Sequence, residues 1–239
     1  MNKRIIAVAM MCVTLVALHG FRAQAQQSYP NEIFVYHLDN KVEYKGKAPK
    51  IGDFLAAYLS QEETSEIKGG LSDAWNHYLR NEPQEPCSQF IIDDKNGYLR
   101  YTFDTKLCDD FEDLDSQTII EMCYWNCADG KHKLIAENVV SMDEGKYLIG
   151  QYSGTMFYIY DNATRQLWSV DDEWLGAYVE PVIDESNCQT TGEDMTVFDE
   201  TVAVYSLPQQ GKDINVVIYR GNKKIETRLV WDGMRFKQQ

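Results

Sequence analysis

The hydrophobic period of the sequence changes near Cys87, and this change is the strongest constraint on the fold. Before it, apolar side chains recur every three or four residues, which is the spacing of amphipathic helices. After it, apolar and polar residues alternate in short runs separated by turn residues, which is typical of antiparallel strands. The sequence therefore predicts an α+β fold with two N-terminal helices followed by a mostly antiparallel β meander.

Two amphipathic helices are predicted before the change. Gly69-Gly70 is expected to break the chain between them, and Pro83 and Pro86 to prevent the second from continuing. Trp75 is predicted to be a core residue, packed with Tyr78 and Leu79 against the sheet. The apolar stripes consist of Ile51, Phe54, Leu55, Tyr58 and Leu59 in the first helix, and of Leu71, Ala74, Trp75, Tyr78 and Leu79 in the second.

Residues 87–239 are predicted to form nine or ten strands joined by short turns. Asn96-Gly97, a pair that favours type I′ turns, is expected to join the first hairpin, and Ala128-Asp129-Gly130 the second. A further strand is predicted at residues 33–38. Residues 26–86 are expected to pack on the β-rich region and to form one continuous domain with it.

Residues 1–25 have the pattern of a secretory signal peptide. Lys3-Arg4 forms a basic start, residues 5–18 carry no charge, and Ala23-Gln24-Ala25 supplies the small residues of a cleavage site. The apolar run is shorter than the roughly 20 residues that a membrane-spanning helix needs. We therefore expect a mature protein that begins near Gln26, without a membrane span, in the periplasm or outside the cell.

The charge of the expected mature chain restricts its partners. Cleavage removes three basic residues and no acidic ones, which leaves 20 basic against 37 acidic residues and a net charge of −17. Such a surface repels phosphate backbones, so nucleic acid is not expected as a partner. Calcium is a possible cofactor, in an acidic segment without the glycine of an EF-hand loop, and a solvated loop is the alternative. Its candidate ligands are Asp109, Asp110, Glu112, Asp113 and Asp115.

Five cysteines remain after cleavage, so at least one is expected to be unpaired. Cys87 and Cys108 flank the first predicted hairpin, two residues out of register for a two-residue turn. Diagonal partners of this kind are about 7 to 8 Å apart in a regular ladder. Because the chain can bend beyond the regular strands, a Cys87–Cys108 disulfide is predicted. Cys188 then has Cys123 or Cys127 as its partner, and the alternative is that all five are reduced, small apolar residues.

Trp174 is the tryptophan that looks least like a core residue, because it lies in an acidic, irregular segment. A ligand site is predicted at Trp174 with Asp171, Asp172 and Glu173, since aromatic rings and carboxylates together suit sugars. Glycosidase chemistry would require two carboxyls about 5 to 9 Å apart, a separation that sequence does not reveal. No residue is assigned a catalytic role.

Four short motifs carry a resemblance to a group of known proteins. They are Ala23-Gln24-Ala25, Lys50-Ile51-Gly52-Asp53-Phe54-Leu55, Leu207-Pro208-Gln209-Gln210-Gly211-Lys212-Asp213-Ile214 and Trp231-Asp232-Gly233-Met234-Arg235-Phe236. On these motifs the chain resembles uncharacterised secreted and cell-envelope proteins of the Bacteroidota. The resemblance implies an envelope or extracellular address and supplies no catalytic residue.

Two functions are compatible with these features. The first is a non-enzymatic exported protein that binds a ligand, a glycan or an envelope protein through its β surface. The alternative is a secreted carbohydrate-active enzyme or a carbohydrate-binding accessory module. Two acids and a tryptophan that converge on one cleft would favour the alternative.

Overall fold

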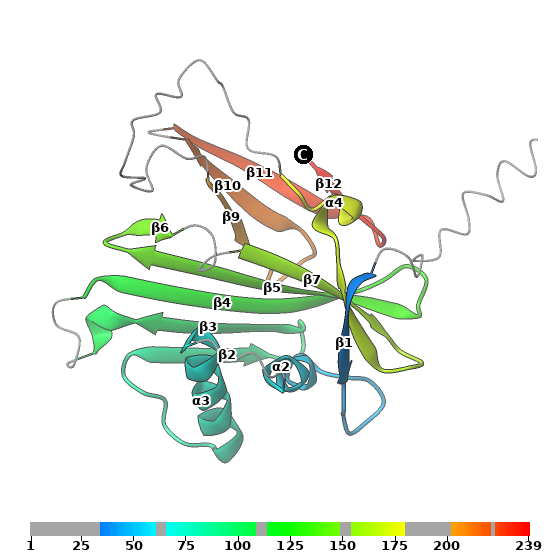
Figure 1. Cartoon of the computed structure of the whole chain (residues 1–239), viewed down its shortest axis with the longest axis horizontal. Coiled ribbons are helices and arrows are strands. Elements are labelled where there is room, and N and C mark those ends of the chain that lie inside the picture. Colours follow the sequence, from blue (N-terminus) through cyan, green and yellow to red (C-terminus); the bar gives the residue numbers. More distant parts are fainter. Residues whose placement is uncertain (1–33, 61–65, 109–113, 149–153, 180–201, 221–222) are drawn as a thin grey trace, which may run out of the picture. The chain divides into compact units, whose positions relative to one another are not determined.

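The protein is mostly antiparallel β-sheet with a few helices, as predicted (Figure 1). The computed structural model describes residues 34–60, 66–108, 114–148, 154–179, 202–220 and 223–239. The predicted signal peptide lies outside these residues and stays a prediction. Within the described part, no helix is both long enough and apolar enough to cross a membrane.

The strands form two sheets instead of one, and within each sheet neighbouring strands follow the order of the chain as in the predicted meander, apart from β1 beside β8 and β6 at the side of β5. The larger sheet has the order β1-β8-β7-β5-β4-β3-β2, with β6 beside β5, and the smaller has the order β12-β11-β10-β9. The larger sheet consists of β1 (Phe34–Lys41), β2 (Ser88–Asp93), β3 (Tyr98–Asp104), β4 (Ser116–Asn126), β5 (His132–Asp143), β6 (Lys146–Leu148), β7 (Gly154–Asp161) and β8 (Gln166–Val170). The smaller sheet consists of β9 (Val202–Ser206), β10 (Ile214–Arg220), β11 (Lys223–Trp231) and β12 (Phe236–Gln238).

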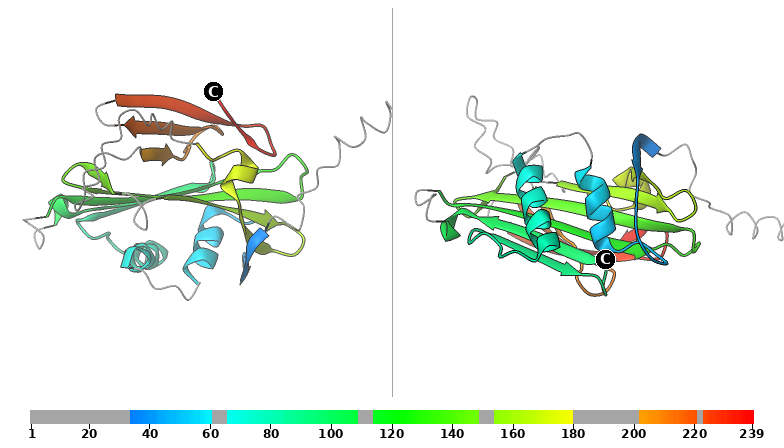
Figure 2. Two further views of the ribbon diagram at one scale, coloured as in Figure 1. Left: turned by 45° about the horizontal axis from the view of Figure 1, so that its top comes forward. Right: turned by 90° about the horizontal axis from the view of Figure 1, so that it is seen from below.

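The larger sheet is covered on both faces (Figure 2). Helices α2 (Ile51–Leu59) and α3 (Glu66–Arg80) pack on one face, and the smaller sheet packs on the other. Trp125 of β4 contacts Trp231 and Phe236 of the smaller sheet, with ring centroids 6.1 and 5.5 Å away. Successive side chains of β4 and β5 therefore point alternately to the helices and to the smaller sheet. The helix-side core includes Ile51, Phe54, Leu55, Leu71, Ala74, Leu99, Tyr101, Ile120, Met122, Ile135 and Tyr158.

Helix α3 runs through Gly69-Gly70, so the predicted break at this pair is wrong. Gly70 lies so close to the sheet that a Cβ atom there would be 2.9 Å from the Tyr101 hydroxyl oxygen. Packing against the sheet therefore outweighs the helix propensity that a glycine loses, about 1 kcal/mol. In this helix, glycine permits a close approach instead of ending the element.

The apolar stripe of α3 is buried only in part. Leu71 and Ala74 are buried as predicted, and Trp75 is partly buried. Tyr78 is 46% exposed and Leu79 is 60% exposed, so the prediction that both belong to the core is wrong, although the Tyr78 ring still contacts Phe90 of β2. The reason is the position of the helix, which lies over the edge strand β2 and its neighbour β3. Among the strands that the structure describes, none lies beyond β2 to cover the outer side of the stripe.

The first hairpin has a four-residue loop, so the predicted two-residue Asn96-Gly97 turn is wrong. Asp93 pairs with Tyr98, and the Asp93 carboxylate accepts hydrogen bonds from the backbone and side-chain nitrogens of Asn96 at 3.1 and 2.7 Å. Gly97 has a φ of +66°, in the left-handed region that favours glycine. Asparagine and glycine thus mark the turn correctly, but the aspartate before them selects a longer one.

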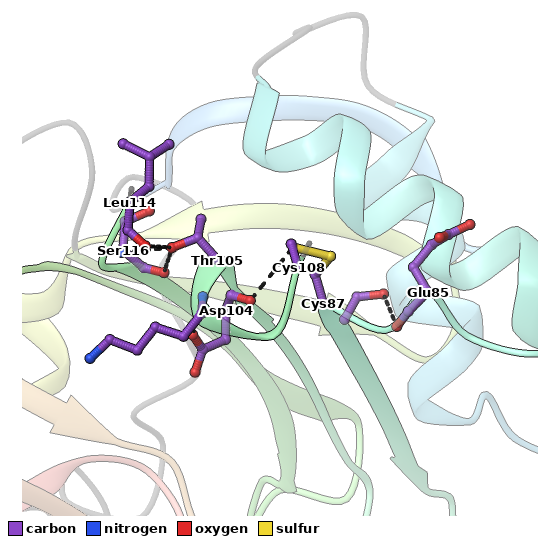
Figure 3. The surroundings of a disulfide bond; sticks show 9 residues. Glu85, Cys87, Asp104, Thr105, Cys108, Leu114 and Ser116 are labelled. Atoms are coloured by element: carbon purple, nitrogen blue, oxygen red, sulfur yellow. Dashed lines mark hydrogen bonds between the residues drawn. A yellow bond between two sulfur atoms is a disulfide. The ribbon is translucent and has the colours of Figure 1, made fainter. Parts of the chain in front are cut away.

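The Cys87–Cys108 disulfide is confirmed, with the two Cα atoms 5.0 Å apart (Figure 3). In the observed register, the Asp104 N–H donates to the Cys87 carbonyl, so Cys108 follows four residues after the position opposite Cys87. The short 3-10 helix η1 (Thr105–Leu107) turns the chain back and brings Cys108 to its partner. Cys123 is a buried thiol, and Cys188 lies outside the described residues.

Candidate functional site

The four residues of the predicted ligand site lie together at α4 (Asp172–Leu175). Asp171 precedes this helix, and its carboxylate accepts the N–H groups of Glu173 and Trp174 at 2.8 and 3.3 Å. Asp172 also accepts the Glu173 N–H, at 3.1 Å. Trp174 is partly buried, and the guanidinium carbon of Arg235 lies 5.1 Å from its ring centroid. The Asp171 carboxylate thus caps α4, and Arg235 covers one face of the Trp174 ring. The ligand site itself stays a prediction.

The predicted calcium site falls mostly outside the described residues. Of its five acids, only Asp115 is described, and its carboxylate forms a 2.7 Å salt bridge with Lys106. Among the residues that the structure describes, no group of three or more His, Cys, Asp or Glu side chains is arranged to hold a metal ion. Calcium at this segment stays a prediction.

A stacked pair of aromatic rings on α3, with Trp75 partly buried and Tyr78 exposed, was not predicted. The Trp75 and Tyr78 rings are nearly parallel, with an interplanar angle of 13° and centroids 5.6 Å apart. The Phe90 ring of β2 meets Tyr78 edge-on at 5.7 Å and supports it from the sheet side. We call the surface formed by Trp75, Tyr78 and Leu79 the aromatic surface. The helical spacing predicted these three residues as core. The spacing does not reveal which residues of an apolar stripe contact the sheet and which lie beyond its edge.

The aromatic surface is held from below by close packing. A Cβ atom on Gly52 of α2 would be 2.9 Å from the Trp75 ring, so glycine allows the indole to lie against the helix backbone. The Gln84 side chain pairs with both backbone groups of Phe90, accepting its N–H at 2.5 Å and donating to its carbonyl at 2.9 Å. This pairing occupies the outer edge of β2 as a neighbouring strand would, and it fixes the residue that supports Tyr78.

An ion pair lies beside the aromatic surface. The Lys50 ammonium contacts the Asp94 carboxylate at 2.6 Å, and both side chains are well exposed. The hydrogen bond that Lys50 donates to Asp94 raises the pKa of Lys50, with a smaller contribution from the nearby Tyr78. A flat ring therefore has an ammonium donor and a carboxylate acceptor at its side.

A buried carboxylate, Glu121 of β4, joins the two sheets. One of its oxygens accepts the Tyr98 hydroxyl at 2.7 Å. The other accepts the Leu207 N–H at 3.0 Å and the side-chain amide of Asn138 at 3.3 Å. The same amide donates to the Tyr205 carbonyl at 2.8 Å. Glu121 thus accepts hydrogen bonds from β3 and β5 of the larger sheet and from Leu207, which follows β9 of the smaller sheet.

A second buried carboxylate, Glu137 of β5, points to the helix side. It is 3% exposed, and it accepts a 3.4 Å hydrogen bond from the Tyr158 hydroxyl of β7 and another from Tyr58 of α2. Lys68 of α3 is also buried, and its ammonium lies 4.7 Å from the Tyr58 ring centroid. Burial raises the pKa of Glu137 to about 7, although the two hydroxyls and the charge of Lys68 oppose the shift. Carboxyls with pKa values near 7 are found where proteins exchange protons.

His132 begins β5 between two aspartates. Its Nδ1 atom lies 2.5 Å from Asp129, and its Nε2 atom lies 3.6 Å from Asp161. Cys127 is its backbone neighbour across the hairpin and donates its N–H to the His132 carbonyl. Since each ring nitrogen faces a carboxylate, the imidazole links the turn that contains Asp129 to Asp161 at the end of β7.

The chain was compared with known protein families, with curated proteins and with solved structures, and none of them matches it. The function is therefore argued from the geometry described above.

Proposed function

We propose that this is an exported protein that binds a neutral glycan at the aromatic surface without transforming it. The observation that carries the proposal is the half-exposed Tyr78 ring, which Trp75 and Phe90 hold in one orientation. A preorganised ring offers a flat apolar face without the entropy cost of ordering a mobile side chain. The C–H face of a sugar ring is a partner of that size and polarity.

The surroundings of the ring favour a sugar over a protein partner. Next to the aromatic surface lie the Lys50–Asp94 ion pair and a second ion pair between Arg80 and Glu82. Hydroxyl groups can both accept from an ammonium and donate to a carboxylate. The strongly negative mature chain repels polyanions, which favours an uncharged glycan.

Export is supported by the sequence pattern of residues 1–25 and by the disulfide. Disulfides persist in oxidising compartments and are rare in the cytosol. The resemblance to secreted and cell-envelope proteins of the Bacteroidota supports the same address. We therefore propose a periplasmic or extracellular location for the protein after cleavage near Gln26.

A carbohydrate-active enzyme or accessory module with its site at Trp174 is the second candidate. The observation in its favour is a partly exposed indole with Asp172 and Glu173 beside it. The Arg235 guanidinium covers one face of the ring, and Asp171 is engaged in capping α4. Because Tyr78 is the more exposed ring, we place binding there.

A glycan array with the mature protein tests the proposal, followed by calorimetry on the glycans that bind. Tyr78→Ala should weaken binding at least tenfold. The matched control is Tyr178→Ala, because Tyr178 is equally exposed, at 47% against 46%, but lies near α4. Tyr178→Ala and Trp174→Ala should each bind as the wild type does. Loss of binding in Trp174→Ala with retention in Tyr78→Ala would move the site to α4, and absence of any bound glycan would overturn the proposal.

A further inference from the structure

Helix α3 connects the buried carboxyl Glu137 with the aromatic surface. Its first turn carries Lys68, which acts on Glu137 through its charge, and its second half carries Trp75 and Tyr78. Lys68 and Tyr78 are ten residues apart, which corresponds to about 15 Å along one rigid helix. A change in how the first turn rests on the sheet is therefore transmitted to the aromatic surface.

The groups that face Glu137 come from three elements. Tyr58 of α2 and Tyr158 of β7 offer hydroxyl donors, and Lys68 of α3 offers a positive charge. The residues paired with Glu137 on the neighbouring strands are Met122 of β4 and Met156 of β7, which do not ionise. Two neutral donors and one ammonium thus surround a carboxyl that is almost completely shielded from water.

We propose that the loss of a proton from Glu137 loosens the seating of α3 on the larger sheet and so weakens ligand binding at the aromatic surface. The second half of this inference rests on the proposed function. A buried carboxylate needs several strong donors to replace its water, and the two hydroxyls and Lys68 replace it incompletely. Opening of the helix layer lets water reach the charged form, whereas the neutral acid keeps the layer closed.

The direction of the pH dependence follows from the raised pKa of Glu137. The closed state binds the proton more tightly than an open state, in which the carboxyl regains its ordinary pKa of 4.5. The layer is therefore held most firmly at low pH. Its stability falls as the pH rises from about 4.5 to about 7 and stays low above that.

Hydrogen exchange of α3 at pH 5.5 and pH 8, corrected for intrinsic rates, tests this without any ligand. A pKa shift from 4.5 to about 7 predicts that protection of α3 falls by up to about 30-fold between these two pH values. Glu137→Gln should remove this dependence, because an amide does not ionise. Glu121→Gln is the control: it alters the carboxylate on the opposite face and should keep the pH dependence of α3.

A second variant keeps the test valid should Glu137→Gln fold poorly. The charge of Lys68 lowers the pKa of Glu137, so Lys68→Met should move the loss of α3 protection to higher pH. Equal pH dependence in the wild type, Glu137→Gln and Lys68→Met would overturn the inference, whether or not a glycan binds.

The link to binding is tested separately, by titrating the wild type and Glu137→Gln with a glycan taken from the array. The wild type should bind more weakly at pH 8 than at pH 5.5, and Glu137→Gln should bind equally at both. Wild-type affinity that does not change with pH would refute the coupling. A chain that binds no glycan refutes the proposed function, while the exchange measurement still decides on Glu137.

Discussion

Glu121 and Glu137 are two buried carboxylates on neighbouring strands of one sheet, and they differ in what surrounds them. Glu121 faces the smaller sheet and accepts three hydrogen bonds from fixed donors, one of them a backbone N–H. Glu137 faces the helices and accepts hydrogen bonds from two tyrosine hydroxyls beside the buried Lys68. The comparison shows that two buried acids of one sheet can have different kinds of donor: a backbone N–H is among those of Glu121, whereas those of Glu137 are side chains.

The two interfaces differ for the same reason. Sheet packing brings backbone groups of the smaller sheet directly to Glu121, because a strand end carries unpaired N–H groups. Helices satisfy most of their backbone groups internally and offer a neighbouring carboxyl only side chains. On the helix side, burial raises the pKa of Glu137 to about 7.

Removal of the Glu121 carboxylate should have the largest effect. Glu121→Ala leaves the Tyr98 hydroxyl, the Leu207 N–H and the Asn138 amide without this acceptor in a buried interface, at a cost of about 3 to 5 kcal/mol. Urea unfolding would measure the loss, with Glu121→Gln as the milder control. A loss below about 1 kcal/mol would show that water replaces the carboxylate and that Glu121 does not hold the sheets together.

Removal of the disulfide gives a reference that is independent of both carboxylates. The double variant Cys87→Ala with Cys108→Ala should lose about 3 kcal/mol, because the bridge closes a loop between residues 21 positions apart. The loss should be equal at pH 5 and pH 8, since no titrating group takes part. If the loss of stability varies with pH, the disulfide region is coupled to the helix layer that contains Glu137, and the disulfide is not an independent reference.

Glu137→Gln should change stability in the opposite direction. Above pH 8 the variant should be more stable than the wild type by about 2 to 3 kcal/mol, because the wild type then keeps a buried charge. Well below pH 4.5 the wild-type carboxyl is neutral in both the folded and the unfolded chain, and the two proteins should unfold alike. Urea unfolding at both pH values measures the difference, and a variant that is less stable at pH 8 would assign Glu137 the same role as Glu121.

The two adjacent glycines of α3 should give the smallest effects. Gly69 is exposed, with nothing within 4 Å of an added Cβ, so Gly69→Ala should stabilise the protein by about 0.5 to 1 kcal/mol through helix propensity. At Gly70, the added Cβ would lie 2.9 Å from the Tyr101 hydroxyl oxygen, so Gly70→Ala should be at least about 1 kcal/mol less stable than Gly69→Ala. Thermal unfolding would separate them, and equal stabilities would mean that α3 is not held tightly against the sheet.

The sequence predicted much of the fold because its elements follow local patterns. The strand predicted at residues 33–38 corresponds to β1, and the β4–β5 hairpin turns at Ala128-Asp129-Gly130 as expected. The errors arose where a distant group decides the outcome. Helix α3 continues through Gly70 because this residue packs closely against Tyr101 of the sheet. Tyr78 is exposed because the sheet ends at β2 and does not extend beneath it.

The candidate sites were less predictable than the fold. Sequence reasoning selected Trp174 from its acidic neighbours, but it missed Glu137, which stands among alternating strand residues like any other polar side chain. Its burial follows from α2 and α3 crossing that part of the sheet. The disulfide was predicted correctly although the predicted register of the β2–β3 hairpin was wrong. The 3-10 helix η1 supplies the bend of the chain that was expected beyond the regular strands.

The most direct measurement is the titration of the two carboxyl groups by NMR, following the side-chain carboxyl carbons of Glu137 and Glu121 from pH 4 to pH 9. Glu137→Gln and Glu121→Gln would identify the two signals. The account predicts a midpoint near pH 7 for Glu137 that moves upward in Lys68→Met, because the charge of Lys68 lowers the pKa of this group. A Glu137 midpoint at or below about 4.5, the ordinary value for glutamate, would contradict it.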